Sequence, residues 1–336
     1  MTSAVIQDLS TFGPNRCDRL NYEQASQYAQ DLVRNQYENF TVISRLLPAR
    51  LRQDFAHVYA FCRWADDLSD ETGDTDKSLE LLNWWRSELD YCYNNQPRHP
   101  VFIALAHTIQ NYDIPRKPFD DLIDAFVQDQ QVKRYSSFEQ VLDYCTRSAN
   151  PVGRLVLYMC GYRDEKRQQL SDATCTALQL ANFWQDVRRD IIERDRVYIP
   201  SNVATRHGLD IGVMVKAVQI DCNDHHHGSD GTRKAGSCAC HGLSSGLRAV
   251  LNPYRKTIHE LVGRTWPLFI EGRALWPLVS SEVRPDIKLF SLGGQAVLKR
   301  IRRAGYNTLT HRPRLGPVAK FTLILRVLAG RFCPIR

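Results

Sequence analysis

The sequence reads YAFCRWADDLSDE over residues 59–71 and NFWQDVRRD over residues 182–190, and these two stretches decide the fold. Each contains an Asp-x-x-x-Asp pair, so in a helix both carboxylates of a pair project from one face. The two pairs are Asp66 with Asp70 and Asp186 with Asp190. Two facing helices would present four carboxylates, and Mg²⁺ prefers hard oxygen ligands combined with substrate phosphates. The pattern therefore suits the ionisation of an allylic diphosphate.

Other polar residues share these helix faces. At about 100° per residue, Tyr59 and Arg63 lie on the same face as the first pair, and Gln179 and Asn182 on the same face as the second. Apolar residues such as Phe61 and Phe183 lie on the opposite sides and would pack into the protein. The alternative is that both faces belong to ordinary amphipathic helices exposed to solvent, and the spacing alone leaves this alternative open.

Helical patterning continues through nearly the whole chain. Strand-like alternation bounded by hairpin turns is missing, which predicts an all-α protein. The predicted helical ranges are 22–36, 51–70, 76–94, 100–112, 117–132, 137–160 and 171–193. Ser171 or Asp172 is the expected N-cap of the last of these.

Length and charge set broader limits. The chain has 336 residues, of which 43% are hydrophobic, so a sizeable core can form. Lys and Arg number 44 against 37 Asp and Glu, giving a formal charge of +7. This excess favours an anionic partner, but it does not distinguish a diphosphate from a lipid surface or nucleic acid.

The N-terminus has no basic start followed by an apolar run, and no stretch of about 18 apolar residues occurs, so neither a signal peptide nor a transmembrane helix is predicted. The ten cysteines are scattered, which favours a reducing compartment. We expect a cytoplasmic protein. Peripheral contact with the inner face of the membrane is an additional expectation, because the apolar and basic residues 320–331 could form a surface helix on anionic lipid; an ordinary packed helix is the alternative.

One segment departs from the helical pattern. Residues 221–247 are rich in Gly, Ser, His and Cys and predict an insertion between two helices. Its Cys and His residues, from Cys222 to His241, could bind Zn²⁺, although their spacing matches no standard finger and a surface loop is the simpler interpretation. The expected organisation is an N-terminal extension (1–19), one domain (20–330) containing this insertion, and a basic tail (331–336).

Three motifs in order resemble those of the squalene/phytoene synthase family. They are YAFCRWADDLSDE at 59–71, YCTRSANPVG at 144–153, and NFWQDVRRD at 182–190 followed by RVYIP at 196–200. The resemblance covers residues 20–215 well and residues 250–330 more loosely. Within the family, ENF at 38–40, LFSLGG at 289–294 and RRAGY at 302–306 resemble the bacterial hydroxysqualene synthase branch.

The resemblance implies a fold and a reaction. The fold is a single-domain isoprenoid-synthase helical bundle around a central apolar cavity. The reaction is the Mg²⁺-dependent conversion of presqualene diphosphate and water into hydroxysqualene and diphosphate, in squalene and hopanoid biosynthesis. A presqualene diphosphate synthase would be a partner that supplies the substrate, and nucleic acid is not an expected partner.

The resemblance also assigns roles to residues. Asp66, Asp70, Asp186 and Asp190 would hold Mg²⁺ directly or through water. The residues expected to act in catalysis, by holding the water that captures the carbocation, are Tyr59, Tyr144 and Gln179. The residues expected to contact the substrate are Phe40, Arg63, Val152, Gly153, Asn182 and Tyr198. Pro151 and Gly153 would break a helix and so open space at the cavity wall.

Two departures from the family pattern bear on the reaction. Enzymes that condense two prenyl diphosphates usually carry Arg directly before the second motif's first Asp, where this chain has Gln185. Tyr198 lies one residue further from Asp190 than usual, which leaves its role open. A condensing synthase that makes presqualene diphosphate, dehydrosqualene or phytoene is the alternative enzyme. Outside the enzymes, the alternatives are an inactive family member and a basic metal-binding adaptor for nucleic acid. The adaptor would leave both Asp faces unexplained.

Overall fold

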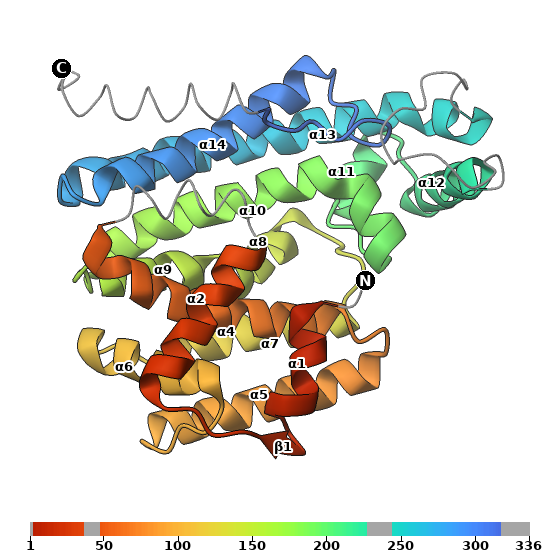
Figure 1. The fold of residues 1–336 in the computed structure, drawn as a ribbon. Coiled ribbons are helices and arrows are strands. Elements are labelled where there is room, and N and C mark those ends of the chain that lie inside the picture. Colours follow the sequence, from red (N-terminus) through yellow and green to blue (C-terminus); the bar gives the residue numbers. More distant parts are fainter. Residues whose placement is uncertain (1–2, 37–47, 227–243, 317–336) are drawn as a thin grey trace.

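The computed structural model describes residues 3–36, 48–226 and 244–316, and in these ranges the chain is almost entirely helical. The helices are α1 (Ala4–Phe12), α2 (Tyr22–Gln36), η1 (Ala49–Leu51), α4 (Arg52–Asp70), α5 (Thr75–Tyr93), α6 (Pro100–Tyr112), α7 (Lys117–Gln131), α8 (Phe138–Ser148), α9 (Asn150–Met159), α10 (Glu165–Arg194), α11 (Ser201–Arg206), α12 (Ile211–His226), α13 (Ser245–Gly272), η2 (Arg273–Leu278) and α14 (Arg284–Arg303). A two-residue strand, β1 (Arg16–Cys17), is the one extended element among the described residues. The predicted all-α fold is confirmed (Figure 1).

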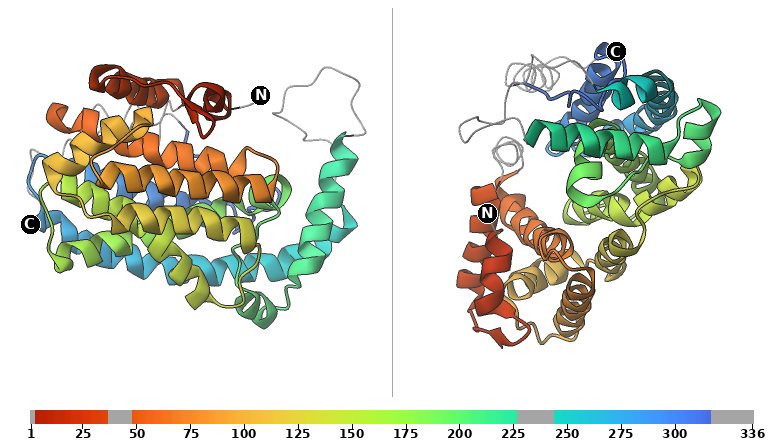
Figure 2. Two further views of the ribbon diagram at one scale, coloured as in Figure 1. Left: turned by 90° about the horizontal axis from the view of Figure 1, so that it is seen from below. Right: turned by 90° about the vertical axis from the view of Figure 1, so that its right-hand side faces the viewer.

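Buried apolar side chains form two separate clusters, which we call the first core and the second core. The first core is built mainly by α2, α4, α5, α6 and α7, and its largest side chains include Trp64 and Trp85. The second core is built mainly by α8, α10, α12 and α13, around Trp184 and Tyr254. The two groups of helices lie side by side in Figure 2. The two carboxylate helices, α4 and α10, therefore belong to different cores.

Helix α10 is longer than the sequence pattern predicted. It begins at Glu165 rather than near residue 171, and its N-cap is Asp164, whose side chain accepts a hydrogen bond from the backbone N–H of Arg167. The predicted N-caps, Ser171 and Asp172, lie inside the helix, so that prediction is wrong. The extra turns give α10 the length to contact both α9 and α13.

The predicted helix over residues 137–160 is two helices, because the chain bends at Ala149 between α8 and α9. The break precedes Pro151, which occupies the first turn of α9, where its missing N–H costs nothing. Gly153 does not open space at the break. A Cβ at this position would lie 2.4 Å from Ser171 Oγ and 2.5 Å from Cys175 Sγ, so the glycine lets α9 approach α10 closely.

The predicted domain limits differ from the helices at two places. Helix α1 lies in the predicted N-terminal extension, but its Val5 is fully buried in the first core. Helix α12 continues to His226, so the first residues of the predicted insertion are helical, whereas residues 227–243 lie outside the described residues. The tail from residue 317 also lies outside them. No helix in the described ranges is both long enough and apolar enough to span a bilayer.

A buried chain of hydrogen bonds joins α2, α4 and α6. His57 is fully buried, with Nε2 2.8 Å from Ser26 Oγ and Nδ1 2.9 Å from Thr108 Oγ1. The hydroxyl of Thr108 donates to Asp54 Oδ1, so it can only accept from His57, which places the imidazole proton on Nδ1. The neutral ring therefore satisfies both neighbours, and burial lowers the pKa of His57 to about 4.

This network predicts a pH dependence of stability. The folded pKa of His57 lies below its ordinary value of 6.5, so the unfolded chain binds more protons and stability falls as pH drops from about 6.5 to about 4. A His57→Gln variant does not titrate, and its stability deficit relative to wild type should shrink by about 2 to 3 kcal/mol between pH 7.5 and pH 4.5. Urea unfolding at both pH values measures this, with the exposed His311→Gln as the control. A deficit that is the same at both pH values would contradict the neutral, buried His57.

Candidate active site

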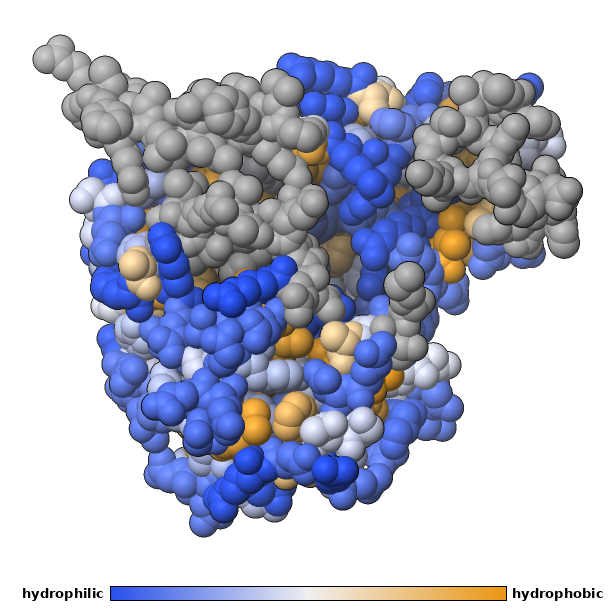
Figure 3. Space-filling model, in the orientation of Figure 1, coloured by the Kyte–Doolittle hydropathy of each residue, from blue (hydrophilic) through white to orange (hydrophobic). Residues whose placement is uncertain are grey.

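A cleft lies between the two cores, lined by carboxylates from three helices. Asp66 and Asp70 come from the last turns of α4, Asp129 from the end of α7 and Asp190 from α10. The cleft has a volume of about 260 Å³. Its other lining residues are Leu122, Ala125, Phe126, Tyr144, Ser148, Gln179, Arg194, Arg196 and Tyr198. On the visible face of the molecule, the described residues are mostly hydrophilic with apolar patches between them (Figure 3).

Three of these carboxyl groups have raised pKa values, and two of them, Asp66 and Asp190, are also repelled by a neighbouring carboxylate of their own Asp-x-x-x-Asp pair. Burial, followed by repulsion from Asp70, raises the pKa of Asp66 to about 6. Burial, followed by repulsion from Asp186, raises the pKa of Asp190 to about 7. The side chain of Asp66 still exposes 45% of its surface toward the cleft, so water screens it more than it screens Asp190, at 13%. Like charges gathered in a cleft in this way favour the binding of a cation.

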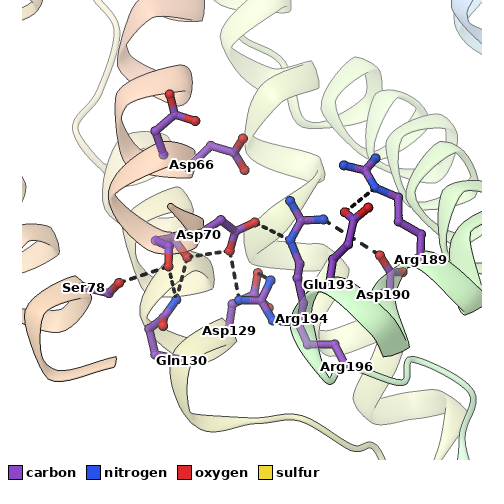
Figure 4. A network of polar contacts seen from close by, with 12 residues as sticks. Asp66, Asp70, Ser78, Asp129, Gln130, Arg189, Asp190, Glu193, Arg194 and Arg196 are labelled. Atoms are coloured by element: carbon purple, nitrogen blue, oxygen red, sulfur yellow. Dashed lines mark hydrogen bonds and ion pairs between the residues drawn. The ribbon is translucent and has the colours of Figure 1, made fainter. Parts of the chain in front are cut away.

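Arginines neutralise part of this charge. Asp70 lies 2.7 Å from Arg194 Nε and 3.1 Å from Arg196, whereas Asp190 is 4.0 Å from Arg194 (Figure 4). Both arginines lie at or just beyond the C-terminal end of α10, so they extend from the second core toward α4 of the first. The cleft therefore presents carboxylates and guanidinium groups side by side, a combination that suits a metal-bound diphosphate.

A buried network forms the inner end of the cleft. The hydroxyl of Tyr144 donates to Asp129 at 2.9 Å, and Arg196 lies 3.4 Å from the same carboxylate. Tyr198 contacts Asp129 at 3.5 Å, and its ring stacks on Phe183 with centroids 3.7 Å apart. Burial raises the pKa of Asp129 to about 6 and holds the pKa of Tyr144 well above its ordinary value. Tyr144 therefore remains a neutral phenol that can orient a neighbouring group.

The structure turns Asp186 away from this cleft. Its carboxylate forms a bidentate pair with Arg312, whose Nη2 lies 2.7 Å from Oδ2. Asp186 and Arg312 line a second cleft of about 480 Å³, together with Arg188, Arg189 and Arg314. The preceding residue, Gln185, is buried and donates its amide hydrogen to the carbonyl oxygen of Pro313. Two neighbouring residues of α10 thus hold the segment that follows α14.

The remaining predicted site residues are dispersed. Arg63 pairs with the buried Asp67, its nearest carboxylate, and lies 3.5 Å from Asp66. Gln179 lines the cleft, as Tyr144 and Tyr198 do. Arg63 does not line the cleft. The other predicted residues that do not line it are Tyr59, which is half-buried on α4, Asn182, which is exposed on α10, Val152, which is 41% exposed, and Gly153, which is buried between α9 and α10. Phe40 lies outside the described residues.

Sequence patterns missed three charged residues of the cleft, Asp129, Arg194 and Arg196. None of them belongs to an Asp-x-x-x-Asp pair, although Arg196 stands in the RVYIP stretch quoted above. The available signal was the run of charges from Asp190 to Arg196 directly after the second pair. Asp129 carried no local signal, because its partners Tyr144 and Arg196 lie in other elements.

These residues fit Mg²⁺ without a preformed cage. Among the described residues, no three Asp, Glu, His or Cys side chains converge closely enough to hold a metal ion by themselves. Mg²⁺ is commonly held by one or two carboxylates, with water and substrate phosphates completing its coordination. Burial, followed by charge repulsion, raises the pKa values of Asp66 and Asp190, so these are the residues here that a cation would stabilise most.

Known proteins share this fold and these motifs. The family model for squalene/phytoene synthase matches residues 33–219. A hydroxysqualene synthase of Zymomonas mobilis is 34% identical over 183 residues, which cover 53% of this chain and 60% of that protein. A phytoene synthase of Thermus thermophilus is 28% identical over 305 residues, covering 90% of this chain and 92% of that protein. The matched part of the chain thus spans about 60% of the length of the hydroxysqualene synthases.

Among solved structures, squalene synthase HpnC from Alicyclobacillus acidocaldarius superposes with a TM-score of 0.71. It is 36% identical, and the match covers 85% of this chain and 96% of that one. An all-helical fold, a cleft between two carboxylate helices and a family match over more than half of the chain agree with one another. The chain belongs to the squalene/phytoene synthase family.

Proposed function

We propose that this protein converts presqualene diphosphate and water into hydroxysqualene and diphosphate in a Mg²⁺-dependent reaction of squalene and hopanoid biosynthesis. The observation that carries the proposal is the cleft itself. It combines carboxylates and arginines, suited to a metal-bound diphosphate, with neutral polar side chains that include Tyr144 and Gln179. The similarity to hydroxysqualene synthases and to a structure titled squalene synthase HpnC supports the same reaction.

In the proposed reaction the bond between carbon and the diphosphate oxygen breaks, and the electron pair leaves with diphosphate. Mg²⁺ held by Asp66, Asp70 and Asp190 would neutralise the charge that develops on this leaving group. Arg194 and Arg196, which line the same cleft, would hydrogen-bond these phosphates. Asp186 is a proposed metal ligand too, and it must first separate from Arg312, which is then free to bind phosphate.

The water that captures the carbocation needs neutral partners, because an anionic side chain beside the carbocation would compete with water for it. Tyr144, held by Asp129, and Gln179 provide an oriented phenol and an amide in the cleft. Leu122, Ala125 and Phe126 provide apolar contacts for the hydrocarbon chain. The proton that water loses is transferred to the released diphosphate or to bulk solvent. Tyr59 does not line this cleft and remains a weaker proposal for a catalytic role. Arg63, Asn182, Val152 and Gly153 do not line it either, and they remain weaker proposals for substrate contacts.

Condensation of two prenyl diphosphates is the second proposed function, because a phytoene synthase matches nearly the whole chain. Gln185 argues against it. Its side chain is neutral, and its amide is hydrogen-bonded to the carbonyl oxygen of Pro313 inside the protein. It therefore provides no fixed positive charge beside a diphosphate, whereas the arginine of condensing enzymes would. Under the first proposal, a partner enzyme that makes presqualene diphosphate would have to supply the substrate.

Product analysis tests the proposal directly. Purified protein is incubated separately with presqualene, farnesyl and geranylgeranyl diphosphates, with Mg²⁺ or with EDTA, and the lipids are identified by mass spectrometry. We expect a C30 alcohol from presqualene diphosphate alone, and none with EDTA. Presqualene diphosphate or a longer condensed product from farnesyl or geranylgeranyl diphosphate would replace the first proposal with the second.

A further inference from the structure

A third cavity, which we call the α13–α14 pocket, lies between helices α13 and α14 and shares no residue with either cleft described above. Its volume is about 140 Å³, roughly half that of the acidic cleft. The residues that line it are His259, Val262, Gly263 and Trp266 of α13 with Leu298, Lys299, Arg302 and Tyr306 of α14 and the turn that follows it. The two helices run side by side along one edge of the molecule (Figure 1).

The shape of this pocket follows from two backbone features. Gly263 sits inside a long helix, where glycine costs about 1 kcal/mol relative to alanine, and a Cβ there would meet no atom within 4 Å. Packing therefore does not require a glycine, and its missing side chain keeps the pocket open. After α14, Gly305 and Tyr306 adopt positive φ angles of 62° and 59°, which turn the Tyr306 ring back onto His259, with ring centroids 4.7 Å apart.

The charge of the pocket is positive. Lys299 and Arg302 are exposed, and neither forms an ion pair within the described residues. Glu260, which follows the pocket residue His259 on α13, is already paired with Arg206, His207 and Arg264. Residues 287–336 contain 11 Lys and Arg and no Asp or Glu, whereas the whole chain carries only +7, so the first 286 residues are net negative. Positive charge is thus concentrated in the part of the chain that includes this pocket.

Apolar residues continue the same face of α13. Trp266 is half-buried at the pocket, and Ile270, one turn further on, is 60% exposed. At about 100° per residue, His259, Trp266 and Ile270 point to the same side of the helix. Unpaired cations beside a half-buried Trp and an exposed Ile are typical of a surface that contacts lipid headgroups.

We propose that the α13–α14 pocket binds a phosphate group, and that this phosphate belongs to the headgroup of an anionic phospholipid. Lys299 and Arg302 donate hydrogen bonds to the phosphate oxygens, and the open space above Gly263 accommodates them. Ile270 and Trp266 contact the acyl boundary beside the headgroup. The site would hold the enzyme at a membrane surface, where its proposed C30 lipid substrate and product reside.

Vesicle binding by the full chain tests this proposal. Flotation is measured with vesicles of phosphatidylcholine alone or mixed with phosphatidylglycerol. Each Lys or Arg at an anionic surface contributes about fivefold to binding, so K299Q/R302Q should weaken binding to the mixed vesicles about 30-fold. The matched control R300Q/R303Q removes the same charge from the same helix outside the pocket, and it should lose no more than about threefold.

Gly263→Leu supplies an independent readout, because it fills the pocket without changing charge and leucine favours a helix. We expect it to weaken binding to the mixed vesicles about tenfold, with an unchanged circular dichroism spectrum. Equal losses in the two double variants, or full binding by Gly263→Leu, would show a general electrostatic effect and overturn the site. Binding of inorganic phosphate in calorimetry without any vesicle binding would overturn the lipid as its source. Turnover in detergent should be unchanged in all three variants, which separates this test from that of the proposed activity.

Discussion

Asp190→Asn is expected to lower kcat/KM for presqualene diphosphate about 1000-fold while leaving the protein folded. Asparagine has nearly the same shape but no charge, so the variant loses the carboxylate proposed to hold Mg²⁺ against the leaving diphosphate. Loss of several kcal/mol of transition-state stabilisation corresponds to a factor of this size. Initial rates at saturating Mg²⁺, measured by product release from presqualene diphosphate, give the value.

Stability distinguishes this loss from damage to the fold. The pKa of Asp190 is raised to about 7, so its ionised form destabilises the folded protein, and this cost grows as pH rises from about 4 to about 7. In metal-free buffer at pH 8, Asp190→Asn should therefore melt at the same or a higher temperature than wild type. Asp195→Asn is the matched control, since Asp195 pairs with Arg134 on the surface and asparagine tolerates its positive φ of 49°. Near-normal turnover by Asp190→Asn would remove this residue from the proposed metal site.

Arg196→Met is expected to lower the free energy of unfolding by about 3 to 5 kcal/mol, because it leaves buried carboxylates without their counter-charge. The Arg196 side chain is 7% exposed and lies between Asp70, at 3.1 Å, and Asp129, at 3.4 Å. Asp70 keeps Arg194 as an ion-pair partner, whereas among the described residues the Asp129 carboxylate keeps only the hydrogen bonds from the hydroxyls of Tyr144 and Tyr198. Urea unfolding at pH 7.5 measures the loss.

Two further variants make this prediction specific. Adding Asp129→Asn to Arg196→Met removes the uncompensated charge and should recover at least about half of the lost stability. Arg194→Met should cost less, because the Arg194 side chain is 27% exposed and water can replace it. If Arg196→Met proves as stable as wild type, or if Asp129→Asn destabilises that variant further, the buried pair of Arg196 and Asp129 does not stabilise the fold as we infer.

The sequence was most informative where spacing along one helix sufficed. The bounds of α2 and α6 agree with the predicted ranges because proline and polar residues flank them. Asp66, Asp70 and Asp190 were found from the same kind of local spacing, and they do line one cleft. The start of α10 was missed because Ser171 and Asp172 looked like caps, although the helix begins at the Asp164 cap seven residues earlier.

Contacts between distant segments could not be predicted in this way. The direction of Asp186 is decided by Arg312, which lies 126 residues further along the chain. Asp129 belongs to the site because Tyr144 and Arg196 reach it from other elements, and a period of three or four residues does not carry that information. Gly153 was taken for a helix breaker, whereas the nearby Ser171 and Cys175 make it a packing residue.

The division of the interior into two cores has a mechanical consequence. Asp66 and Asp70 are carried by the first core and Asp190 by the second. Arg194 and Arg196 reach across the cleft from the second core to Asp70, and Tyr144 and Tyr198 reach across it to Asp129. A diphosphate with its metal ions, bound to both pairs, would act as a removable cross-link between the halves. Ligand binding should then raise the cooperativity of unfolding as well as its midpoint, because the two halves could no longer open separately.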